Sequence, residues 1–146
     1  MGDLGDLHIS VETTPTREDV AVLEAGLTAH TLPIIGTPGF KPLAVFLRDT
    51  AGHIVAGAYG HTNWNWLHIS LVWVAEAERR KGVGRELILA FEAAAAQRGC
   101  RQAHLDTFSY QARPFYERLG YRVFGELEDY PTGHSRFFLR KQLPQG

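Results

Sequence analysis

The sequence predicts an α/β fold in which a mixed sheet is flanked by helices. Three observations lead to this prediction. Short runs of alternating, β-branched or aromatic residues recur along the chain, segments with apolar residues at helical spacing separate them, and Gly and Pro mark the boundaries. The expected order of elements is β-α-β-β-β-α-β-α-β-β. Because no linker interrupts this order, residues 1–146 are expected to form one domain.

The N-terminal part of the chain is expected to hold a strand, a helix and a loop. Residues 7–14, LHISVETT, alternate apolar and polar side chains as a half-buried strand does. Residues 15–30 have apolar side chains at helical spacing, and Thr16 stands where a side chain caps a helix N-terminus. Residues 31–42, TLPIIGTPGFKP, are rich in Gly and Pro and indicate an exposed loop.

A hairpin and a central strand are predicted next. Residues 43–49 and 53–62 are strand-like, and the turn TAG at residues 50–52 joins them. The stretch WLHISLVWV, Trp66–Val74, is rich in β-branched and aromatic residues and is apolar throughout much of its length. This composition is typical of a strand in the middle of a sheet.

A second helix is predicted after the stretch RRKGVG. Apolar residues recur there at helical spacing, and Gly99 can end the helix in a left-handed conformation. Residues 101–108, RQAHLDTF, follow as another strand. The apolar helix positions are Leu87, Ile88, Phe91 and Ala94 or Ala95.

The chain is predicted to close with a short helix and a second hairpin. The segment QARPFYERLG favours a helix, because Pro114 is tolerated in a first turn and Gly120 can stop it. Residues 121–130 and 135–143 are strand-like and flank the turn PTGH.

Composition and charge narrow the class of protein. Hydrophobic residues make up 45% and charged residues 21%, as in an ordinary soluble globular protein. The formal net charge of −1 gives no overall electrostatic attraction to nucleic acid or to an acidic membrane, so neither is expected as a partner. No uninterrupted apolar run could span a bilayer, and the start MGDLGDLHIS does not resemble a secretory signal. The single Cys100 fits a reducing compartment, so we expect a cytoplasmic protein.

A basic segment stands directly before the second helix. Arg79, Arg80 and Lys81 precede a Gly-x-Gly formed by Gly82 and Gly84. A helix N-terminus leaves backbone N–H groups unpaired and carries partial positive charge, and glycines keep side chains away from those amides. Such a site needs a basic rim rather than a basic protein. The segment therefore predicts a local site for phosphate.

The alternative interpretation of this segment is a solvated basic loop. Two features favour the anion site: the segment follows a central-type strand after a short loop, and its cations sit at the helix end where an anion would compensate them. The pattern Gly-x-x-x-x-Gly-Lys-(Ser/Thr) is absent, and the Gly-x-Gly lacks the third glycine of the dinucleotide fingerprint. Neither of those two nucleotide sites is predicted.

Two segments carry a resemblance to a known family. RRKGVG matches the acyl-CoA signature (Gln/Arg)-x-x-Gly-x-(Gly/Ala), and ARPFYERLGY has a small residue, an aromatic-Tyr pair and a Gly-aromatic step in order. Over about Leu43–Leu143 the chain resembles the GNAT superfamily of N-acetyltransferases. The resemblance implies a mostly antiparallel sheet, flanked by helices on both faces and splayed at the acetyl-CoA site. It also implies transfer of an acetyl group from acetyl-CoA to a primary amine by direct attack.

The resemblance assigns a donor site residue by residue. The amides from Arg80 to Arg85 would hold the CoA pyrophosphate, and the backbone of Trp73 and Val74 would pair with pantetheine. Where the family often has Asn, this chain has Ser109, whose hydroxyl can still bond the pantetheine arm. The predicted CoA-binding residues are Trp73, Val74, Arg79, Arg80, Lys81, Gly82, Val83, Gly84, Arg85, Ser109 and Ala112.

Two residues are predicted to act in catalysis. Tyr116 falls on the family tyrosine that commonly protonates the leaving CoA thiolate, and a thiol of pKa about 8.5 needs only modest proton donation. The alternative role for Tyr116 is that of a core aromatic on a short amphipathic helix.

His68 is the candidate general base. It lies on the central strand six residues before Val74, where histone-modifying members of the superfamily carry a catalytic Glu, and its ordinary pKa suits the task. The alternatives are a structural role for this histidine, a carboxylate at Asp106, Glu126 or Glu128, and a chain of water molecules.

Three segments are expected to shape the acceptor pocket: HTLPIIGTPGFKP, HTNWNW and EDYPTGHSRF. They combine aromatic and acidic residues, which suits a cationic amine, although an ordinary wet hairpin is the alternative. A small-molecule amine and a peptide amine remain equally open. The histidines lack the spacing of metal ligands, so no metal is predicted. The residues concerned are Phe40, Trp64, Trp66, Tyr130, His30, His61, His134, Glu126, Glu128 and Asp129.

Two classes of function compete at this point. The first is an acyl-CoA-dependent N-acyltransferase, and the second is a non-catalytic acyl-CoA-binding or regulatory module on the same fold, since a fold does not guarantee chemistry. The near-neutral charge and the absence of aromatic residues beside RRKG disfavour nucleic-acid binding. Phe137 and Phe138 on the last strand could pair two subunits, so a homodimer is a further hypothesis. Strand alternation places one of the two in the core.

Overall fold

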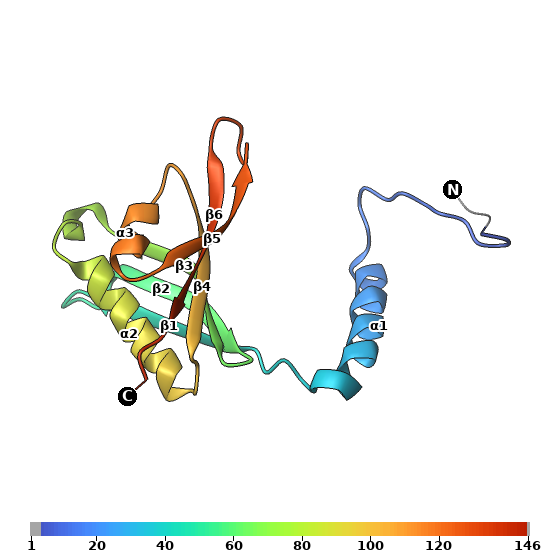
Figure 1. The fold of residues 1–146 in the computed structure, drawn as a ribbon, viewed down its shortest axis with the longest axis horizontal. Helices are drawn as coiled ribbons and strands as arrows, with labels where there is room; N and C mark the ends of the chain where they lie inside the picture. The colour runs from blue at the N-terminus through green and yellow to red at the C-terminus, as the bar shows by residue number, and fades with distance from the viewer. Residues whose placement is uncertain (1–3, 146) are drawn as a thin grey trace. The chain divides into compact units, whose positions relative to one another are not determined.

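The computed structural model describes residues 4–145 of the chain. The chain falls into two compact units, Met1–Pro38 and Gly39–Gly146. The first unit holds one long helix, and the second holds a six-stranded sheet with two α-helices (Figure 1). Between residues 4 and 145, no helix combines the length and the apolar character needed to cross a membrane.

Helix α1 of the first unit is Arg17–Ile35. The Thr16 hydroxyl accepts a backbone N–H of the first turn at 3.1 Å, so the predicted cap is confirmed. The helix is longer than predicted, because residues 31–35 of the expected loop are helical. Pro33 lies inside this extension, where it removes one backbone donor without ending the helix. The helix ends at Gly36, whose φ is 70°.

The strand predicted at residues 7–14 is wrong, because residues 4–14 contain no strand. Alternating side chains are compatible with a strand, but a strand forms only where a neighbouring strand supplies backbone partners. The alternation carries no information about such a partner. The observed order is therefore α-β-β-β-α-β-α-β-β, with a short 3-10 turn at Glu76–Glu78 before the second helix.

The six strands form one sheet in the order β1-β2-β3-β4-β6-β5 (Figure 1). Only the β3–β4 pair is parallel. The predicted fold class, a mixed and mostly antiparallel sheet flanked by helices, is confirmed. The strands are β1 Lys41–Arg48, β2 Ile54–Asn63, β3 Trp66–Val74, β4 Gln102–Phe108, β5 Arg122–Glu128 and β6 Ser135–Gln142.

Helices α2, Val83–Gln97, and α3, Arg113–Arg118, contribute side chains to one core with the sheet. Burial of each large apolar side chain stabilises the fold by about 1.5–3 kcal/mol. Gly99 ends α2 with φ 91°, and Gly120 ends α3 with φ 98°, both as predicted. The α2 side chains buried at the predicted helical spacing are Leu87, Ile88, Phe91 and Ala95.

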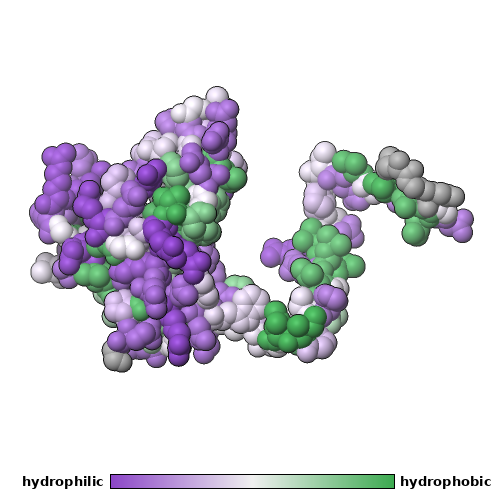
Figure 2. Space-filling view, viewed as in Figure 1, coloured by the Kyte–Doolittle hydropathy of each residue, from purple (hydrophilic) through white to green (hydrophobic). Residues whose placement is uncertain are grey.

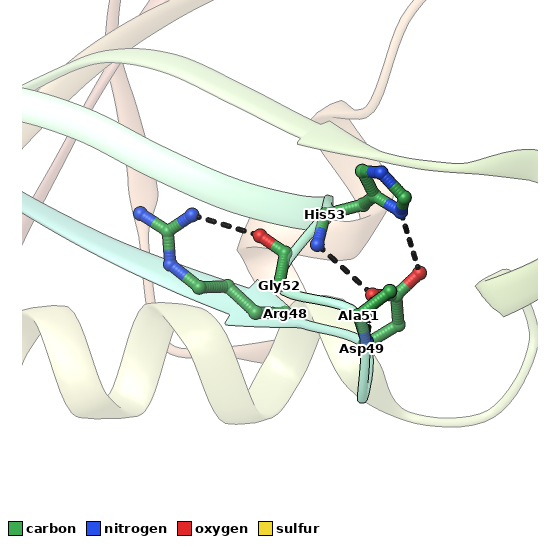
Figure 3. A network of polar contacts seen from close by, with 5 residues as sticks. All are labelled: Arg48, Asp49, Ala51, Gly52 and His53. Carbon is green, nitrogen blue, oxygen red and sulfur yellow. Dashed lines mark hydrogen bonds and ion pairs between the residues drawn. The ribbon is translucent and has the colours of Figure 1, made fainter.

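The turn between β1 and β2 is held by one carboxylate (Figure 3). Asp49 Oδ1 accepts the N–H groups of Ala51 and His53, each at 2.9 Å. The His53 ring lies 3.4 Å from the other carboxylate oxygen, and Arg48 donates to the Gly52 carbonyl at 3.2 Å. Gly52 has φ 89°, a conformation that glycine adopts readily. The predicted turn is confirmed.

The two faces of the last strand differ in burial. Phe137 is 7% exposed and lies in the core, while its neighbour Phe138 is only partly buried. One of the two is therefore core, as predicted. Figure 2 shows mostly hydrophilic residues over the visible face of the second unit, with a hydrophobic area beside the β5–β6 hairpin. Phe124 and Leu127 of β5 have exposed side chains.

Strands β3 and β4 are paired over only three residues each. Trp66–His68 are opposite Gln102–His104, and the two strands have no register partners beyond these. Just after this pairing ends, the register of β2 with β3 shifts and leaves Ser70 as an extra residue in β3. Such a bulge bends its strand. A wedge therefore opens between β3 and β4 beyond His68.

Candidate active site

The N-terminus of α2 has the free amides that an anion site needs. Gly82 precedes the helix with φ 78°, and the first intrahelical hydrogen bond joins the Glu86 N–H to the Gly82 carbonyl at 3.2 Å. Within the described chain no side chain caps this end, so the N–H groups of Val83, Gly84 and Arg85 are left for water or a ligand. A Cβ at Gly82 would meet no atom within 4 Å. Open space therefore lies in front of the helix.

The predicted basic rim surrounds this helix end. Arg79 Nε donates to the Val74 carbonyl at 2.9 Å, which holds the loop against the end of β3. Lys81 Nζ lies 3.3 Å from an oxygen of Glu78, in an exposed pair that contributes little to stability. Arg80 is exposed and has φ 65°. Free amides, open space and cations together fit the pyrophosphate group that the family resemblance implies.

Gly84 has a packing role that differs from that of Gly82. A Cβ at Gly84 would lie 3.2 Å from Cζ of Phe115 and 4.0 Å from a methyl group of Val74. The missing side chain lets α3 and the end of β3 approach the first turn of α2. The Gly-x-Gly thus serves two purposes: Gly82 leaves space for a ligand, and Gly84 brings three elements together.

The wedge between β3 and β4 holds a cavity of about 210 Å³. Its lining includes Ser70, Asp106, Ala112 and Tyr116. Burial raises the pKa of Tyr116 to about 12, so its phenol stays protonated at neutral pH. The hydroxyl has no hydrogen-bond partner among residues 4–145, yet every fully buried polar side-chain atom there has one. The Tyr116 hydroxyl is therefore accessible from the cavity.

The backbone at the end of β3 points in two directions. The Ala75 N–H donates to the Val55 carbonyl at 2.8 Å. Successive residues of an antiparallel ladder direct their backbone groups to alternate sides. Trp73 therefore directs its N–H and carbonyl towards β2, whereas Val74 directs its own away from β2, on the side of the wedge.

Ser109 and Ala112, both predicted to contact CoA, have different surroundings. The Ser109 hydroxyl accepts the Ser135 N–H at 3.1 Å and lies 3.2 Å from His134 Nδ1. The Ser109 N–H donates to the Ser135 carbonyl at 2.8 Å. These contacts tie Ser109 to the start of β6. Ala112 precedes α3 and lines the wedge cavity.

Three histidines lie side by side across the sheet, and we refer to His61, His68 and His104 as the histidine row. They are register partners on β2, β3 and β4. The ring centroids of His61 and His68 are 5.1 Å apart, and those of His68 and His104 are 4.6 Å apart. Their strand neighbours Leu67 and Ala103 are in the core, so the row occupies the opposite face.

The surroundings of the histidine row keep two of its members neutral. Burial, and to a lesser extent the neighbouring His61, lower the pKa of His68, while Asp106 acts against this shift. Burial and the two other histidines lower the pKa of His104 to about 4. Asp106 itself is held by Arg136, whose Nε lies 2.8 Å from Oδ2. Neutral imidazoles at neutral pH can accept a proton.

The histidine row lines an open cavity of about 600 Å³. Four of the residues predicted for the acceptor pocket, Phe40, His61, Trp64 and Trp66, come together there. The sequence also placed an acidic cluster in that pocket, but Glu126 accepts a hydrogen bond from the Ser135 hydroxyl at 2.8 Å and does not line this cavity. The other lining residues are Asn63, His68, His104, Phe124 and Arg140.

Sequence reasoning missed His104 and Arg140. A signal for His104 was available, because the alternation in RQAHLDTF places it with Asp106 on the polar face of its strand. Its position beside His68 depends on the register of two strands separated by a whole helix. Local pattern cannot supply that register.

The comparisons with known proteins agree with this geometry. The Acetyltransferase (GNAT) family matches residues 17–121. The blasticidin-S acetyltransferase of Streptomyces morookaense is 35% identical over 112 residues, which make up 76% of this chain and 82% of that protein. Acetyltransferase Atu2258 of Agrobacterium fabrum is 33% identical over 117 residues, 80% of this chain and 85% of that protein.

Solved structures extend the comparison to the fold. An acetyltransferase from Bacillus cereus superposes with a TM-score of 0.86 and 32% sequence identity, covering 94% of this chain and 98% of that one. This chain therefore belongs to the GNAT family of acetyltransferases, enzymes whose acetyl donor is acetyl-CoA.

Proposed function

We propose that this acetyltransferase acetylates the primary amine of a small molecule, and that the amine attacks the thioester of acetyl-CoA directly in a ternary complex. The observation that carries the proposal is the position of two cavities at the end of the β3–β4 pairing. His68 and His104 line the larger cavity, and the next residue of each strand, Ile69 or Leu105, lines the wedge. A donor in the wedge and an acceptor beside the histidine row would meet at this point.

The donor side would consist of the residues that the motifs indicate. The amides of Val83, Gly84 and Arg85, with the basic rim, would hold the pyrophosphate of CoA. The backbone N–H of Val74 on the wedge side would pair with pantetheine, whereas its carbonyl already accepts from Arg79. Acetyl-CoA supplies an acetyl group activated as a thioester. Ser109 would act indirectly in this arrangement, since its hydroxyl is bound to the start of β6.

Tyr116 would stabilise the leaving sulfur. Its hydroxyl opens onto the wedge, and its raised pKa of about 12 keeps the proton in place. A phenol that is a weaker acid than the CoA thiol releases its proton reluctantly. We therefore expect hydrogen bonding to the developing thiolate to precede proton transfer.

His68 would draw the proton from the attacking amine. Its Nδ1 lies 3.1 Å from the Ser70 hydroxyl. In the tautomer in which Nδ1–H donates to that hydroxyl, Nε2 is left to accept the proton from the amine or from an intervening water molecule. Its lowered pKa keeps the ring neutral at neutral pH. The ring centroid of His104 lies 4.6 Å from that of His68. Because the pKa of His104 is lowered to about 4, His104 would stay neutral while His68 holds a proton.

Direct attack is favoured because the chain offers no suitable thiol for an acyl-enzyme. Cys100 is the only cysteine of the sequence. It is 2% exposed, and burial raises the pKa of its thiol. A buried, protonated thiol is a poor nucleophile.

The relatives support a small-molecule acceptor and an active enzyme. The Streptomyces morookaense protein is named for the acetylation of blasticidin S, and both curated relatives are named acetyltransferases. Their names favour turnover over a non-catalytic CoA-binding module. We further propose that both compact units belong to one functional domain, because the family match spans them. The homodimer and the cytoplasmic location stay predictions of the sequence.

A thermal-shift series with acetyl-CoA, CoA, ATP and NAD tests the donor site. A ligand at about one hundred times its dissociation constant stabilises the folded state by roughly 2.7 kcal/mol, which raises the midpoint by several degrees. We expect a shift with acetyl-CoA and CoA alone. The same protein should then release free thiol from acetyl-CoA when primary amines are added. A shift with neither CoA species would remove the basis of the proposal.

A further inference from the structure

We infer that the acceptor is an amine carried on a flat aromatic or heteroaromatic ring system without a second positive charge. The inference rests on the proposed function, because it names the substrate class for the cavity beside the histidine row. Three independent observations support it: the rings that line the cavity, the conformation of one of them, and the charges that the lining provides.

Rings dominate the cavity. Seven of its nine lining residues carry a planar ring. The rings touch one another in sequence: Phe40 lies 5.1 Å from His61, and Trp66 lies 5.5 Å from His104, at the two ends of the histidine row. Aromatic pairs at such distances gain from stacked or edge contacts beyond simple burial. A flat ring system can use these contacts, whereas a saturated chain of the same size obtains burial alone.

Several of these rings are exposed within the second unit. Phe40 is 61% exposed, Trp64 is 53% exposed and Phe124 is 57% exposed. Scattered surface aromatics need no explanation, but exposed rings gathered round one cavity indicate a place where something binds. The size of about 600 Å³ suits a small molecule rather than a folded partner.

Trp64 occupies a backbone position that costs stability. It is the first of two turn residues between β2 and β3, with φ 48°, and Asn65 follows with φ 64°. A two-residue hairpin turn with positive φ at both positions favours Asn or Gly. A bulky residue in the left-handed region loses on the order of 1 kcal/mol. The hairpin thus places an indole at the cavity at some cost to folding, as functional sites often do.

The charges in the lining disfavour a polycationic amine. Among the described residues that line the cavity, Arg140 alone carries a permanent charge, and it is positive. Arg140 lies over the Trp66 ring at 5.0 Å and donates to the Gln102 side chain at 2.8 Å. The described lining residues, all from the second unit, include no carboxylate that could neutralise a second ammonium group. An amine with one cationic centre, which loses its proton on reaction, avoids this penalty.

The first experiment compares amines that differ in flatness and charge. Thiol release from acetyl-CoA is measured with benzylamine, cyclohexylmethylamine, tryptamine and spermidine. We expect kcat/KM to be at least 10-fold higher for benzylamine than for its saturated counterpart, higher still for tryptamine, and lowest for spermidine. Equal or greater kcat/KM for cyclohexylmethylamine or spermidine would overturn the inference while leaving the acetyltransferase proposal intact.

A binding measurement separates this inference from the proposed function. Quenching of the protein's tryptophan fluorescence is recorded without acetyl-CoA. The added amines are benzylamine and cyclohexylmethylamine, which have no indole fluorescence of their own. Saturable quenching by benzylamine alone supports the inference even if no amine is acetylated, an outcome that would contradict only the proposed function. The absence of saturable quenching by benzylamine, together with the absence of turnover, would overturn the inference.

The variant Trp64→Asn gives a test that does not depend on loss of folding. Asn relieves the backbone cost, so the unfolding midpoint should rise by about 3 °C, from about 1 kcal/mol gained. The KM for tryptamine should rise about 10-fold with kcat little changed. Tyr59→Leu is the control, because this exposed ring on β2 lies outside the cavity, and its KM should match the parent. An unchanged KM in Trp64→Asn would contradict the assignment.

Discussion

The proton affinity of His68 depends on its place at the end of the β3–β4 pairing. Register brings His61 and His104 to either side of it, and partial burial removes the water that would stabilise an imidazolium. The same position puts its ring in the acceptor cavity and its next neighbour in the wedge. The surroundings of His68 thus lower its pKa, and its strand places it where the two cavities meet.

The pH dependence of turnover should report this histidine. A base must be neutral, and the pKa of His68 is lowered, so the midpoint of the acidic limb of kcat should lie below the ordinary histidine value of about 6.5. His68→Gln should reduce kcat at pH 7 by about 100-fold and remove this acidic limb. The measurement is kcat against pH at saturating amine. His53→Gln, an exposed histidine of the β1–β2 turn, is the control. A variant His68→Gln with the parental pH profile would exclude His68 as the base.

The role proposed for Tyr116 predicts a separation of binding from turnover. Tyr116→Phe removes the hydroxyl but keeps the ring that packs against Phe115 and Tyr121. We expect kcat to fall about 100-fold while the thermal shift with CoA is unchanged. Tyr59→Phe, an exposed tyrosine on β2, should behave as the parent. If Tyr116→Phe kept the parental kcat at every pH, Tyr116 would be a core aromatic and no more.

At the scale of elements, a buried polar cluster joins α2 to the C-terminal half of the sheet. Glu92 of α2 is 3% exposed and accepts a hydrogen bond from the Tyr121 hydroxyl at 2.7 Å. Lys141 of β6 donates to its other oxygen at 2.8 Å. Burial, with the charge and hydrogen bond of Glu92, raises the pKa of Tyr121, which keeps this donor protonated. A carboxylate so enclosed must keep both partners, because an unpaired buried charge is costly.

Removal of that charge should destabilise the protein. Glu92→Gln leaves the Lys141 ammonium, whose side chain is 13% exposed, without its counter-ion. We expect a loss of about 3 kcal/mol in the free energy of unfolding, measured by urea denaturation. Glu117→Gln is the matched control, because Glu117 pairs with Arg113 in the open and should contribute less than about 0.5 kcal/mol. Equal stability of the two variants would show that the buried cluster is not stabilising.

At the scale of the whole molecule, the elements that local pattern specifies were predictable and the long-range pairings were not. Helix α2 and the hairpins carry their own signals in spacing, caps and turns. The positions of the motif residues at the start of α2 and of Tyr116 on α3 were also predictable, because each motif belongs to one continuous segment. The alternation at residues 7–14 gave a wrong strand, since alternation specifies no partner. His104 escaped notice because its neighbour His68 comes from a strand on the far side of α2.

The brief pairing of β3 with β4 has a consequence for energetics. Strands β1, β2 and β3 form one half of the sheet, β4, β6 and β5 form the other, and the ladder between the two halves has three residue pairs. A molecule seated in the wedge would touch both halves and so replace the missing ladder with contacts of its own. Donor binding and the cooperativity of unfolding are then thermodynamically linked. A substitution that loosens either half of the sheet will weaken donor binding even when it lies far from the donor.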